Sequence, residues 1–351
     1  MCNRKSAAFI LFFLLFISCA PGDRYMTFSG YAQGGTYTVK LNLNGVTESP
    51  ETIRDSVDAL LVRIDRSLSG YNGNSLLSRF NAGETIKPDS LFLDIYSRAY
   101  NFYEETGGAL DASSAPLFDI WGFGFKKGEM PDDAAVKEVM GACGMDRLVG
   151  EMDRVADADG NVSAHRMLLA EGEIPKLNYN AIAQGYSCDV VARYLYSIGV
   201  KDMMVDIGEI FCDGKNPAGQ PWTLGLDRPT DGNNDPGADM QGIFKVPDGP
   251  HGVVTSGNYR KFYIRDGKKY AHTVDPRTGY PVEHNLLSAT IVASDAITAD
   301  AYATYCMVIG LEQAKEFISS RSDLEACLVY DDGGVFRTWC SEGFVLTEPT
   351  L

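Results

Sequence analysis

Positive charge is scarce in this sequence. Its 351 residues contain 31 Lys and Arg against 47 Asp and Glu, a formal net charge of −16, and no block of Lys or Arg follows the first few residues. A surface of this sign repels the phosphates of nucleic acids, so nucleic-acid binding is excluded as the main function. It also repels phosphorylated ligands, which must then be held by a cation, by backbone amides or by a helix terminus.

Long hydrophobic runs are also scarce, and the clearest one lies at the N-terminus. Arg4 and Lys5 precede an apolar run over about residues 7–17. This arrangement is typical of a signal peptide, which we expect over residues 1–18, and the run is too short to span a membrane comfortably. No later stretch is long and apolar enough to be expected to cross a bilayer.

The residues after this run resemble a bacterial lipoprotein signal. Ser18 is a small residue directly before Cys19, although Phe16 stands where Leu is usual. The pattern predicts a lipid anchor at Cys19 and a tether over residues 19–24, which would hold the mature chain on a bacterial membrane, outside the cytoplasm and on its periplasmic side. Plain secretion with an incidental Cys19 is the alternative.

The eight cysteines show no spacing of a metal knuckle or a dense disulfide framework. Cys2 leaves with the signal peptide and Cys19 is the predicted anchor. Disulfides and buried free thiols remain equally open for the others. These are Cys143, Cys188, Cys212, Cys306, Cys327 and Cys340.

Hydrophobic periodicity predicts one continuous α+β domain over residues 25–351, with mixed or antiparallel sheets flanked by helices. A strand interrupted by a Gly turn is expected over residues 25–43, and a single buried strand over 201–211. Helices are expected at residues 49–71, 89–108, 181–200 and 298–319. Further strands are expected at residues 222–229, 242–247, 251–257, 261–276 and 286–294, with a hairpin turn signal at residues 266–268, and a closing hairpin is expected at 325–340.

No Walker loop and no GxGxxG spacing occurs in the sequence. Instead, several turns are rich in glycine and hydroxylated residues, whose amides and hydroxyls can bind phosphate oxygens. Each turn alone is a weak signal, because Gly and Ser fill most turns. The four turns lie at residues 33–36, 107–116, 180–186 and 253–259.

Asp300 and Thr304 lie four residues apart in an otherwise small and apolar helix, so they share one face. A structural explanation is available, since Asp near the first turn favours the helix dipole and Thr can bond back to a carbonyl. His272 is one of only four histidines and can accept a proton near neutral pH, or serve structurally. Tyr71 lies in a polar loop and can stack on a flat ring, or simply be a surface tyrosine.

Seven segments, in order, resemble the FAD:protein FMN transferase (ApbE) family. The resemblance runs from about residue 30 to residue 310. The segments are "GYAQGGTY", "SGYNGNSLLSRFN", "GGALDASSAPLFDIWGFG", "NAIAQGYSCDVV", "VVTSGNY", "YAHTVDPRTGYP" and "ADAYAT".

The resemblance implies an ApbE-like domain with a nucleotide cleft between two sub-regions. Members of the family bind FAD, use Mg²⁺ at its diphosphate, and move FMN onto a Thr hydroxyl of a partner protein while releasing AMP. Asp300 and Thr304 match the metal-ligand helix, and Ala181 matches the residue whose backbone carbonyl joins them. Such hard oxygen ligands suit Mg²⁺. His272 matches the residue proposed to deprotonate the acceptor Thr.

The same matching assigns a set of flavin-nucleotide contacts. They are Gln33, Tyr71, Ala109, Leu110, Asp111, Asn178, Gln184 and Val274. The chain departs from the family where Gln33 replaces Met, Asn178 replaces Asp and Gln184 replaces Lys or Glu. The neutral pair Asn178 and Gln184 keeps hydrogen bonding but removes charge. The usual GGE is GEI at residues 208–210.

The resemblance also implies partners. Extracytoplasmic domains of membrane redox complexes of the Nqr and Rnf type are the expected flavin acceptors, and a shared membrane surface would favour their encounter. Two other functions remain open. One is a Mg²⁺-dependent FAD pyrophosphatase that gives FMN and AMP, and the other is a flavin-binding lipoprotein without turnover. Retention of Asp300 and Thr304 favours an enzyme, and Tyr71 on the adenine side favours transfer.

Overall fold

The computed structural model describes residues 24–84, 86–123, 130–148, 175–230, 232–233, 237–258, 262–265, 268–271 and 273–348. The predicted signal peptide, Cys19 and His272 lie outside these described residues.

The chain begins its sheet with a hairpin. The alternating strands β1 (Tyr25–Ala32) and β2 (Gly35–Asn42) pair in antiparallel register about Gln33 and Gly34. They form one edge of an eight-stranded sheet with the order β1-β2-β3-β4-β7-β12-β13-β14, in which every neighbouring pair is antiparallel. The remaining strands of this sheet are β3 (Met203–Asp206), β4 (Ile210–Asp213), β7 (His251–Gly257), β12 (Leu286–Ala293), β13 (Glu325–Asp332) and β14 (Val335–Cys340).

Smaller sheets accompany the large one. A three-stranded sheet has the order β15-β6-β5, and two short hairpins pair β8 with β9 and β10 with β11. Their bounds are β5 (Thr223–Asp227), β6 (Met240–Lys245), β8 (Phe262–Arg265), β9 (Lys268–Ala271), β10 (Val274–Asp275), β11 (Tyr280–Pro281) and β15 (Leu346–Thr347).

Side chains at the helix starts satisfy backbone amides that the helix itself leaves free. Ser49 accepts from the amide of Thr52 at the start of α1, and Asp89 accepts from the amide of Phe92 at the start of α3. The helical elements of the described residues are α1 (Pro50–Leu68), α2 (Leu76–Asn81), α3 (Ser90–Glu105), α4 (Ala115–Ile120), α5 (Asp133–Met140), the 3₁₀ turn η1 (Met145–Arg147), α6 (Ala183–Ser197), α7 (Ala296–Ile309) and α8 (Leu311–Ser319).

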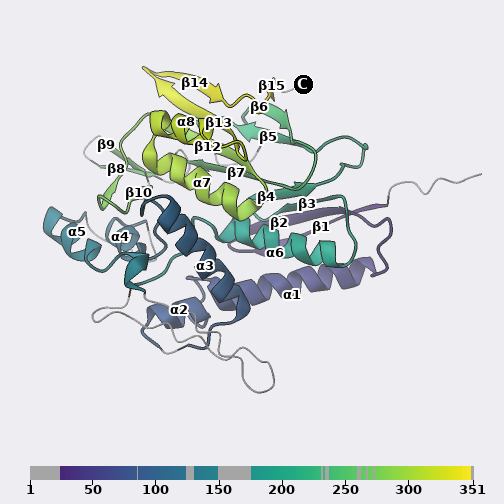
Figure 1. Ribbon diagram of the computed structural model, residues 1–351, viewed down its shortest axis with the longest axis horizontal. Coiled ribbons are helices and arrows are strands. Elements are labelled where there is room, and N and C mark those ends of the chain that lie inside the picture. The colour runs from purple at the N-terminus through teal and green to yellow at the C-terminus, as the bar shows by residue number, and fades with distance from the viewer. Residues whose placement is uncertain are drawn as a thin grey trace, which may run out of the picture.

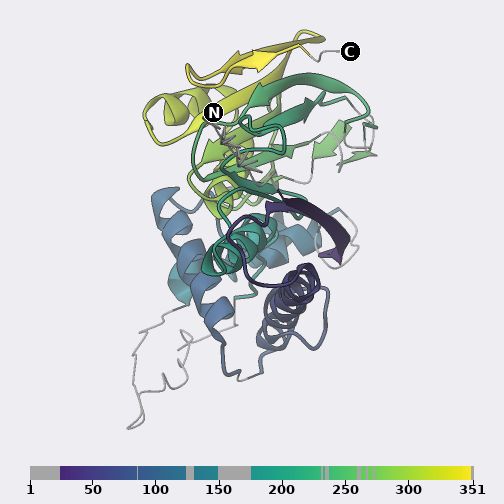
Figure 2. The ribbon, with the colours of Figure 1, turned by 90° about the vertical axis from the view of Figure 1, so that its right-hand side faces the viewer.

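Alternate strand residues point to opposite faces of the large sheet, and each face carries buried side chains of a different core. Val254 and Ile291 join the main core, which includes residues of α1, α3, α6 and α7. Their neighbours Val253 and Val292 join a second core with residues of β5 and β6. Helices therefore cover one face and the three-stranded sheet covers the other (Figures 1 and 2). The α+β prediction for the domain is confirmed.

Two expected elements are each divided by a glycine with positive φ. The strand expected over residues 201–211 is two strands, β3 and β4, that reverse at Gly208 (φ 90°). The helix expected over residues 298–319 is α7 and α8, separated by Gly310 (φ 78°). Both expectations of an unbroken element were wrong, because an L side chain rarely adopts this conformation but glycine does.

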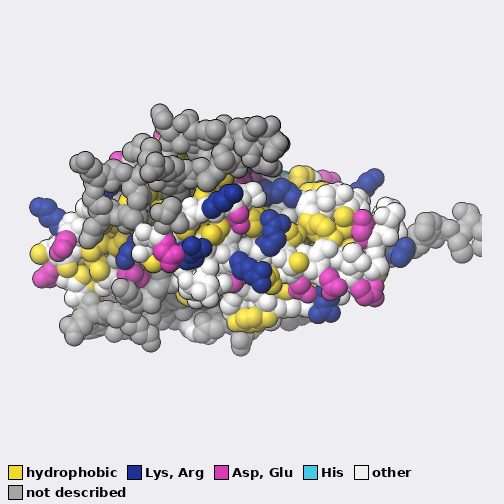
Figure 3. Space-filling view, turned by 90° about the horizontal axis from the view of Figure 1, so that it is seen from below, with side chains coloured by type: hydrophobic (Ala, Val, Ile, Leu, Met, Phe, Trp, Pro, Cys, Tyr) yellow, Lys and Arg dark blue, Asp and Glu magenta, His cyan; other side chains and the backbone are white. Residues whose placement is uncertain are grey.

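Surface charge is not spread evenly over the molecule. Seen from below, several Lys and Arg side chains gather near the middle of the face, with Asp and Glu side chains around them (Figure 3). Among the described helices, none is long and apolar enough to cross a membrane.

Candidate functional site

The centre of the candidate site is the first half of α7. Asp300 is 5% exposed, and its Oδ2 accepts a hydrogen bond of 3.0 Å from the amide of Gly185 in the first turn of α6. Thr304 lies one turn further along α7, on the same face. The α6 N-terminus and the α7 carboxylate therefore meet, although 115 residues separate them in sequence.

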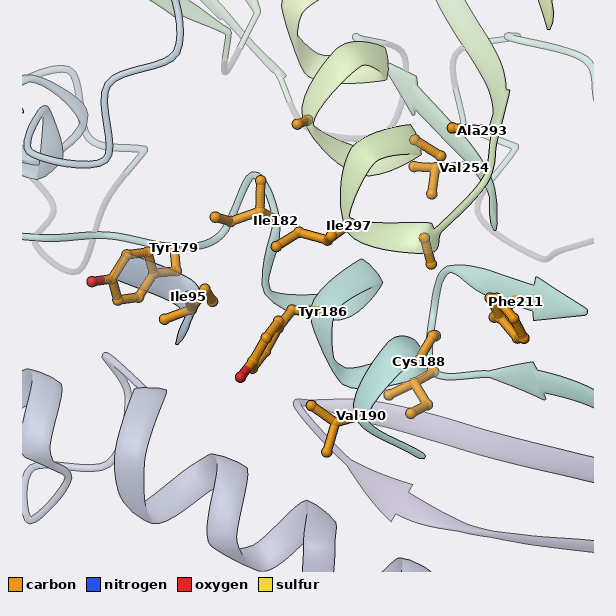
Figure 4. Close-up of a cluster of buried hydrophobic side chains, with 14 of the residues drawn as sticks. Ile95, Tyr179, Ile182, Tyr186, Cys188, Val190, Phe211, Val254, Ala293 and Ile297 are labelled. Carbon is orange, nitrogen blue, oxygen red and sulfur yellow. The ribbon is translucent and has the colours of Figure 1, made fainter. Parts of the chain in front are cut away.

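Two glycines allow this close approach. A Cβ at Gly185 would lie 2.3 Å from the carbonyl oxygen of Ala296 and 2.9 Å from Cβ of Asp300. A Cβ at Gly252 in β7 would lie 2.3 Å from Cα of Ala296. Figure 4 shows the packing beside this junction, where Ile182, just before α6, and Ile297, in α7, lie next to each other. The start of α7 is thus held between α6 and β7 without intervening side chains.

Ala181 lies in the turn that leads into α6. Gly185 is the third residue of α6, so its amide is one of those that the helix itself leaves without a partner, and it donates to Asp300. Within the described part of the chain, no hydrogen bond reaches the Ala181 carbonyl oxygen. The carbonyl is therefore not used within the turn, and its role as a metal ligand, which the family resemblance implies, stays a prediction.

Burial controls the chemistry of the carboxylates at this junction. It raises the pKa of Asp300 to about 8, an effect that the Gly185 amide opposes and nearby Asp189 strengthens. Burial likewise raises the pKa of Asp189 to about 7. Burial disfavours the ionised form of these carboxyl groups, and a bound cation would stabilise that form.

Asp189 is a site residue that the sequence prediction missed. Its carboxylate accepts from the amides of Ala296 (2.8 Å) and Ile297 (2.9 Å), the first two residues of α7. Asp295 caps the same helix by accepting from the Thr298 amide. Asp189 therefore fixes α7 to α6. One signal in the sequence could have identified it. Asp189 is a charged residue in an apolar helix that directly follows a predicted phosphate-binding turn.

Thr304 has a hydroxyl partner from the sheet. Its Oγ1 lies 3.3 Å from Oγ of Ser256 in β7. Ser256 belongs to one of the glycine- and hydroxyl-rich segments, but it was not singled out as a site residue. The pair holds the Thr304 hydroxyl on the side of α7 that faces the sheet.

The residues present fit a hard divalent cation. They offer one buried carboxylate, one hydroxyl and one backbone carbonyl, which are the oxygen ligands that Mg²⁺ prefers. Among the described residues, no group of three or more His, Cys, Asp and Glu side chains forms a metal cluster. A cation at Asp300 would therefore have few protein ligands and would keep positions for water or phosphate.

Two predicted nucleotide-binding residues gather near the α6 N-terminus. Gln33, in the β1–β2 turn with φ 51°, donates from Nε2 to Oγ of Ser187 in α6. Gln184 lies against the β3–β4 turn, where a Cβ at Gly208 would be 2.3 Å from Nε2 of Gln184. Two turns that are distant in sequence thus border the first turn of α6.

A second group of predicted residues is joined by hydrogen bonds. Tyr71 is 76% exposed, and its hydroxyl accepts from Nδ2 of Asn180 at 3.3 Å. The Asn180 amide donates to Oδ1 of Asn178 at 2.8 Å, and the Asn178 amide donates to the carbonyl of Ala112 at 2.7 Å. These bonds bring the Tyr71 loop, the turn before α6 and the loop before α4 together.

The remaining predicted contacts are less exposed. The side chains of Ala109, Leu110 and Val274 are buried, so any contact of these residues with a nucleotide is through the backbone. Asp111 accepts from both the amide and the hydroxyl of Ser113, and burial raises the pKa of its carboxyl group. Val274 packs with Leu117 in a cluster apart from the main core. The predicted nucleotide cleft between two sub-regions stays a prediction.

An antiparallel sheet with helices on one face defines an α+β protein, and its buried carboxylate Asp300 lies at a helix–helix junction. The chain belongs to the ApbE family, whose model matches residues 34–328.

Similar proteins agree with this assignment. The chain is 33% identical over 288 residues to the FAD:protein FMN transferase of Salmonella typhimurium, covering 80% of this chain and 77% of that protein. It resembles the structure of Pseudomonas stutzeri flavinyl transferase ApbE with a TM-score of 0.75 and 29% identity, covering 91% of this chain and 95% of that one. The flavin transferase ApbE from Vibrio cholerae gives a TM-score of 0.74 at 28% identity, with 91% and 98% covered.

Proposed function

We propose that this protein is an FAD:protein FMN transferase that requires Mg²⁺ and modifies a threonine hydroxyl of a partner protein, releasing AMP. Membership of the ApbE family and the names of similar proteins support the transferase activity. The matched motifs support the threonine acceptor, and the matched motifs together with the oxygen atoms at the α6–α7 junction support the metal.

The observation that carries the proposal is the contact between Asp300 and the Gly185 amide. It places the buried carboxylate beside the α6 N-terminus, where backbone amides favour anionic groups such as a diphosphate. The motif match adds the Ala181 carbonyl to Asp300 and Thr304 as a proposed ligand. A chain with a net charge of −16 needs such a local arrangement to hold an anionic nucleotide.

Each part of the chain has a distinct task. Asp300, Thr304 and the Ala181 carbonyl would hold Mg²⁺, which when bound would offset the diphosphate charge and the charge that develops on the departing AMP. Asp189 keeps α7 in place through its two amide bonds. His272 would accept the proton of the acceptor hydroxyl, a role proposed from its motif because this residue lies outside the described residues.

The protein's location and partners are further proposals. The sequence of residues 1–18 supports a signal peptide, and Cys19 supports a lipid anchor on the periplasmic side of a bacterial membrane. In this scheme residues 19–24 are the tether and residues 25–351 are the transferase domain. Flavin-accepting extracytoplasmic domains of Nqr- or Rnf-type membrane complexes are the proposed acceptors.

A mass measurement tests the activity. The protein is incubated with FAD, Mg²⁺ and a candidate acceptor domain, and the acceptor is then weighed intact. A gain of one FMN with equimolar AMP supports the transferase. AMP and free FMN without a modified acceptor, for several acceptor domains, would indicate the pyrophosphatase, and bound FAD without AMP would indicate a carrier.

Two variants make the assay specific for the site. Asp300→Ala should abolish transfer because it removes the only charged member of the predicted ligand set. Asp323→Ala is the matched control, since it removes a carboxylate that is exposed and paired with Arg321 instead. Equal loss of transfer in both variants would contradict the assigned role of Asp300.

A further inference from the structure

Two cysteines face each other at the edge of the large sheet. Cys327 in β13 is the register partner of Cys340 in β14. At the next pair, the Ser341 amide donates to the Ala326 carbonyl at 2.9 Å. Hydrogen-bonded and non-hydrogen-bonded pairs alternate along an antiparallel ladder, so Cys327 and Cys340 form a non-hydrogen-bonded pair.

This kind of pair has the spacing that a disulfide needs. Its Cα atoms are about 4.5 Å apart, and disulfides join Cα atoms roughly 4.4–6.8 Å apart. Cys327 is fully buried and Cys340 is half-buried, and both pack in the core between the large sheet and the three-stranded sheet. The strand neighbours Ala326 and Leu328 point to the opposite core. Both thiols therefore lie on the same side of the sheet.

Each of the two thiols also shifts the pKa of the other. A hydrogen bond with Cys340 raises the pKa of Cys327, and the same bond lowers the pKa of Cys340. Cys340 is thus both the more exposed thiol and the one whose thiolate is favoured, which are the two properties of an attacking thiol.

A pairing of Cys327 with Cys212 is unfavourable. Cys212 shares the second core but lies in β4, and β7 and β12 separate it from β13. With strands spaced about 4.8 Å apart, Cys212 is at least about 14 Å from Cys327, beyond the reach of a disulfide.

We infer that Cys327 and Cys340 form a dithiol–disulfide pair that links β14 to β13 when oxidised. The oxidant is a low-molecular-weight disulfide. The Cys340 thiolate attacks one sulfur of that disulfide and expels one thiolate. Cys327 then loses its proton and attacks the Cys340 sulfur, expelling the second thiolate. Two protein thiols are oxidised, and one external disulfide is reduced to two thiols.

The link would act on an edge strand. Among the described strands, β14 pairs only with β13, and its Val335 and Phe336 are 56% and 41% exposed. A bond at Cys340 closes a loop of about 14 residues in the unfolded chain, which predicts a rise in melting temperature of about 4 °C. Amide exchange in β14 should slow more than exchange in β1, the opposite edge of the sheet.

The test treats the full chain, in detergent if it is lipidated, with oxidised glutathione at graded ratios to reduced glutathione. Free thiols are then alkylated in denaturant, and the protein is digested without reduction. We expect a fall in mass of two hydrogen atoms and a peptide pair joined through Cys327 and Cys340. Reduction should reverse the bond and the rise in melting temperature.

Two variants complete the test. Cys340→Ser, at a half-buried position, should abolish the mass change while the chain stays folded by circular dichroism. Cys143→Ser, at another half-buried cysteine, should leave it unchanged. Full alkylation of both thiols, separate glutathione adducts on each, or a joined peptide that involves Cys143 would overturn the inference.

Discussion

The substitution Gly185→Ala would test whether the contact between α6 and α7 builds the site. The new methyl carbon would lie 2.3 Å from the Ala296 carbonyl oxygen and 2.7 Å from its carbon. Both are backbone atoms, so a side-chain rotation cannot relieve the overlap. Ordinary contact requires the helices to separate by about 1 Å, which would also stretch the bond between the residue 185 amide and Asp300.

Opposing effects set the magnitude of this change. Alanine favours a helix over glycine by about 1 kcal/mol. Overpacking costs about 1–3 kcal/mol, and weakening the buried hydrogen bond to Asp300, which is protonated near pH 7 in the metal-free protein, costs about 0.5–1.5 kcal/mol. The clash dominates, so we expect a net loss of about 1–3 kcal/mol in the free energy of unfolding. Displacement of Asp300 should also weaken Mg²⁺ binding, by about 10-fold or more.

Urea unfolding followed by circular dichroism, with and without Mg²⁺, measures the first effect, and calorimetric titration measures the second. Gly35→Ala is the control, because a Cβ at Gly35 meets nothing within 4 Å. An unchanged midpoint and unchanged Mg²⁺ affinity in Gly185→Ala would refute the reasoning, since the helices would then tolerate separation without loss of the site.

Further predictions concern the carboxylates and the hydroxyl of the site. Because burial raises the pKa of Asp300 to about 8, Mg²⁺ must displace a proton at lower pH, and its affinity should rise up to about 10-fold per pH unit between about pH 6 and 8. A titration that is flat over this range would contradict the prediction, and Asp300→Asn should bind Mg²⁺ weakly at every pH. The same raised pKa stabilises the metal-free fold most below the unfolded value near 4, and this contribution is lost as pH rises through about 8. The urea midpoint of the metal-free protein should therefore fall more steeply between about pH 5 and 8 than that of Asp300→Asn, whereas equal slopes would assign the fall to other groups. Asp189→Ala should lower the free energy of unfolding by about 1–2 kcal/mol and speed amide exchange at Ala296 and Ile297, and unchanged exchange there would exclude the capping role. Thr304→Val should weaken Mg²⁺ binding while Thr304→Ser preserves it, so equal affinities would show that the hydroxyl is not a ligand.

Local signals in the sequence predicted much of the fold. The helix expected at residues 49–71 and the Gly-interrupted strand expected over residues 25–43 match α1 and the β1–β2 hairpin closely, since these elements are specified by neighbouring residues. Gly208 and Gly310 were harder, because a glycine in a hydrophobic stretch is compatible with both continuation and reversal. Short elements such as α4 and the β10–β11 pair depend on tertiary contacts and left no clear periodicity.

The candidate site was predicted in part for a similar reason. Asp300 and Thr304 share a helix face, so their spacing of four residues is readable from the sequence. The Gly185 bond and the Asp189 cap join α6 to α7 across more than 100 residues, and no local pattern reports such a contact. The family resemblance supplied the Ala181 assignment, which composition and spacing do not predict.

The central claim, a metal site at the α6–α7 junction of an FMN transferase, is tested most directly by diffraction. Crystals grown with FAD and Mn²⁺, as a substitute for Mg²⁺, would be measured at the manganese absorption edge. The account predicts an anomalous peak within coordination distance of Asp300, Thr304 and the Ala181 carbonyl, next to the bound diphosphate. A strong peak elsewhere, with Asp300 still bonded only to the Gly185 amide, would contradict it.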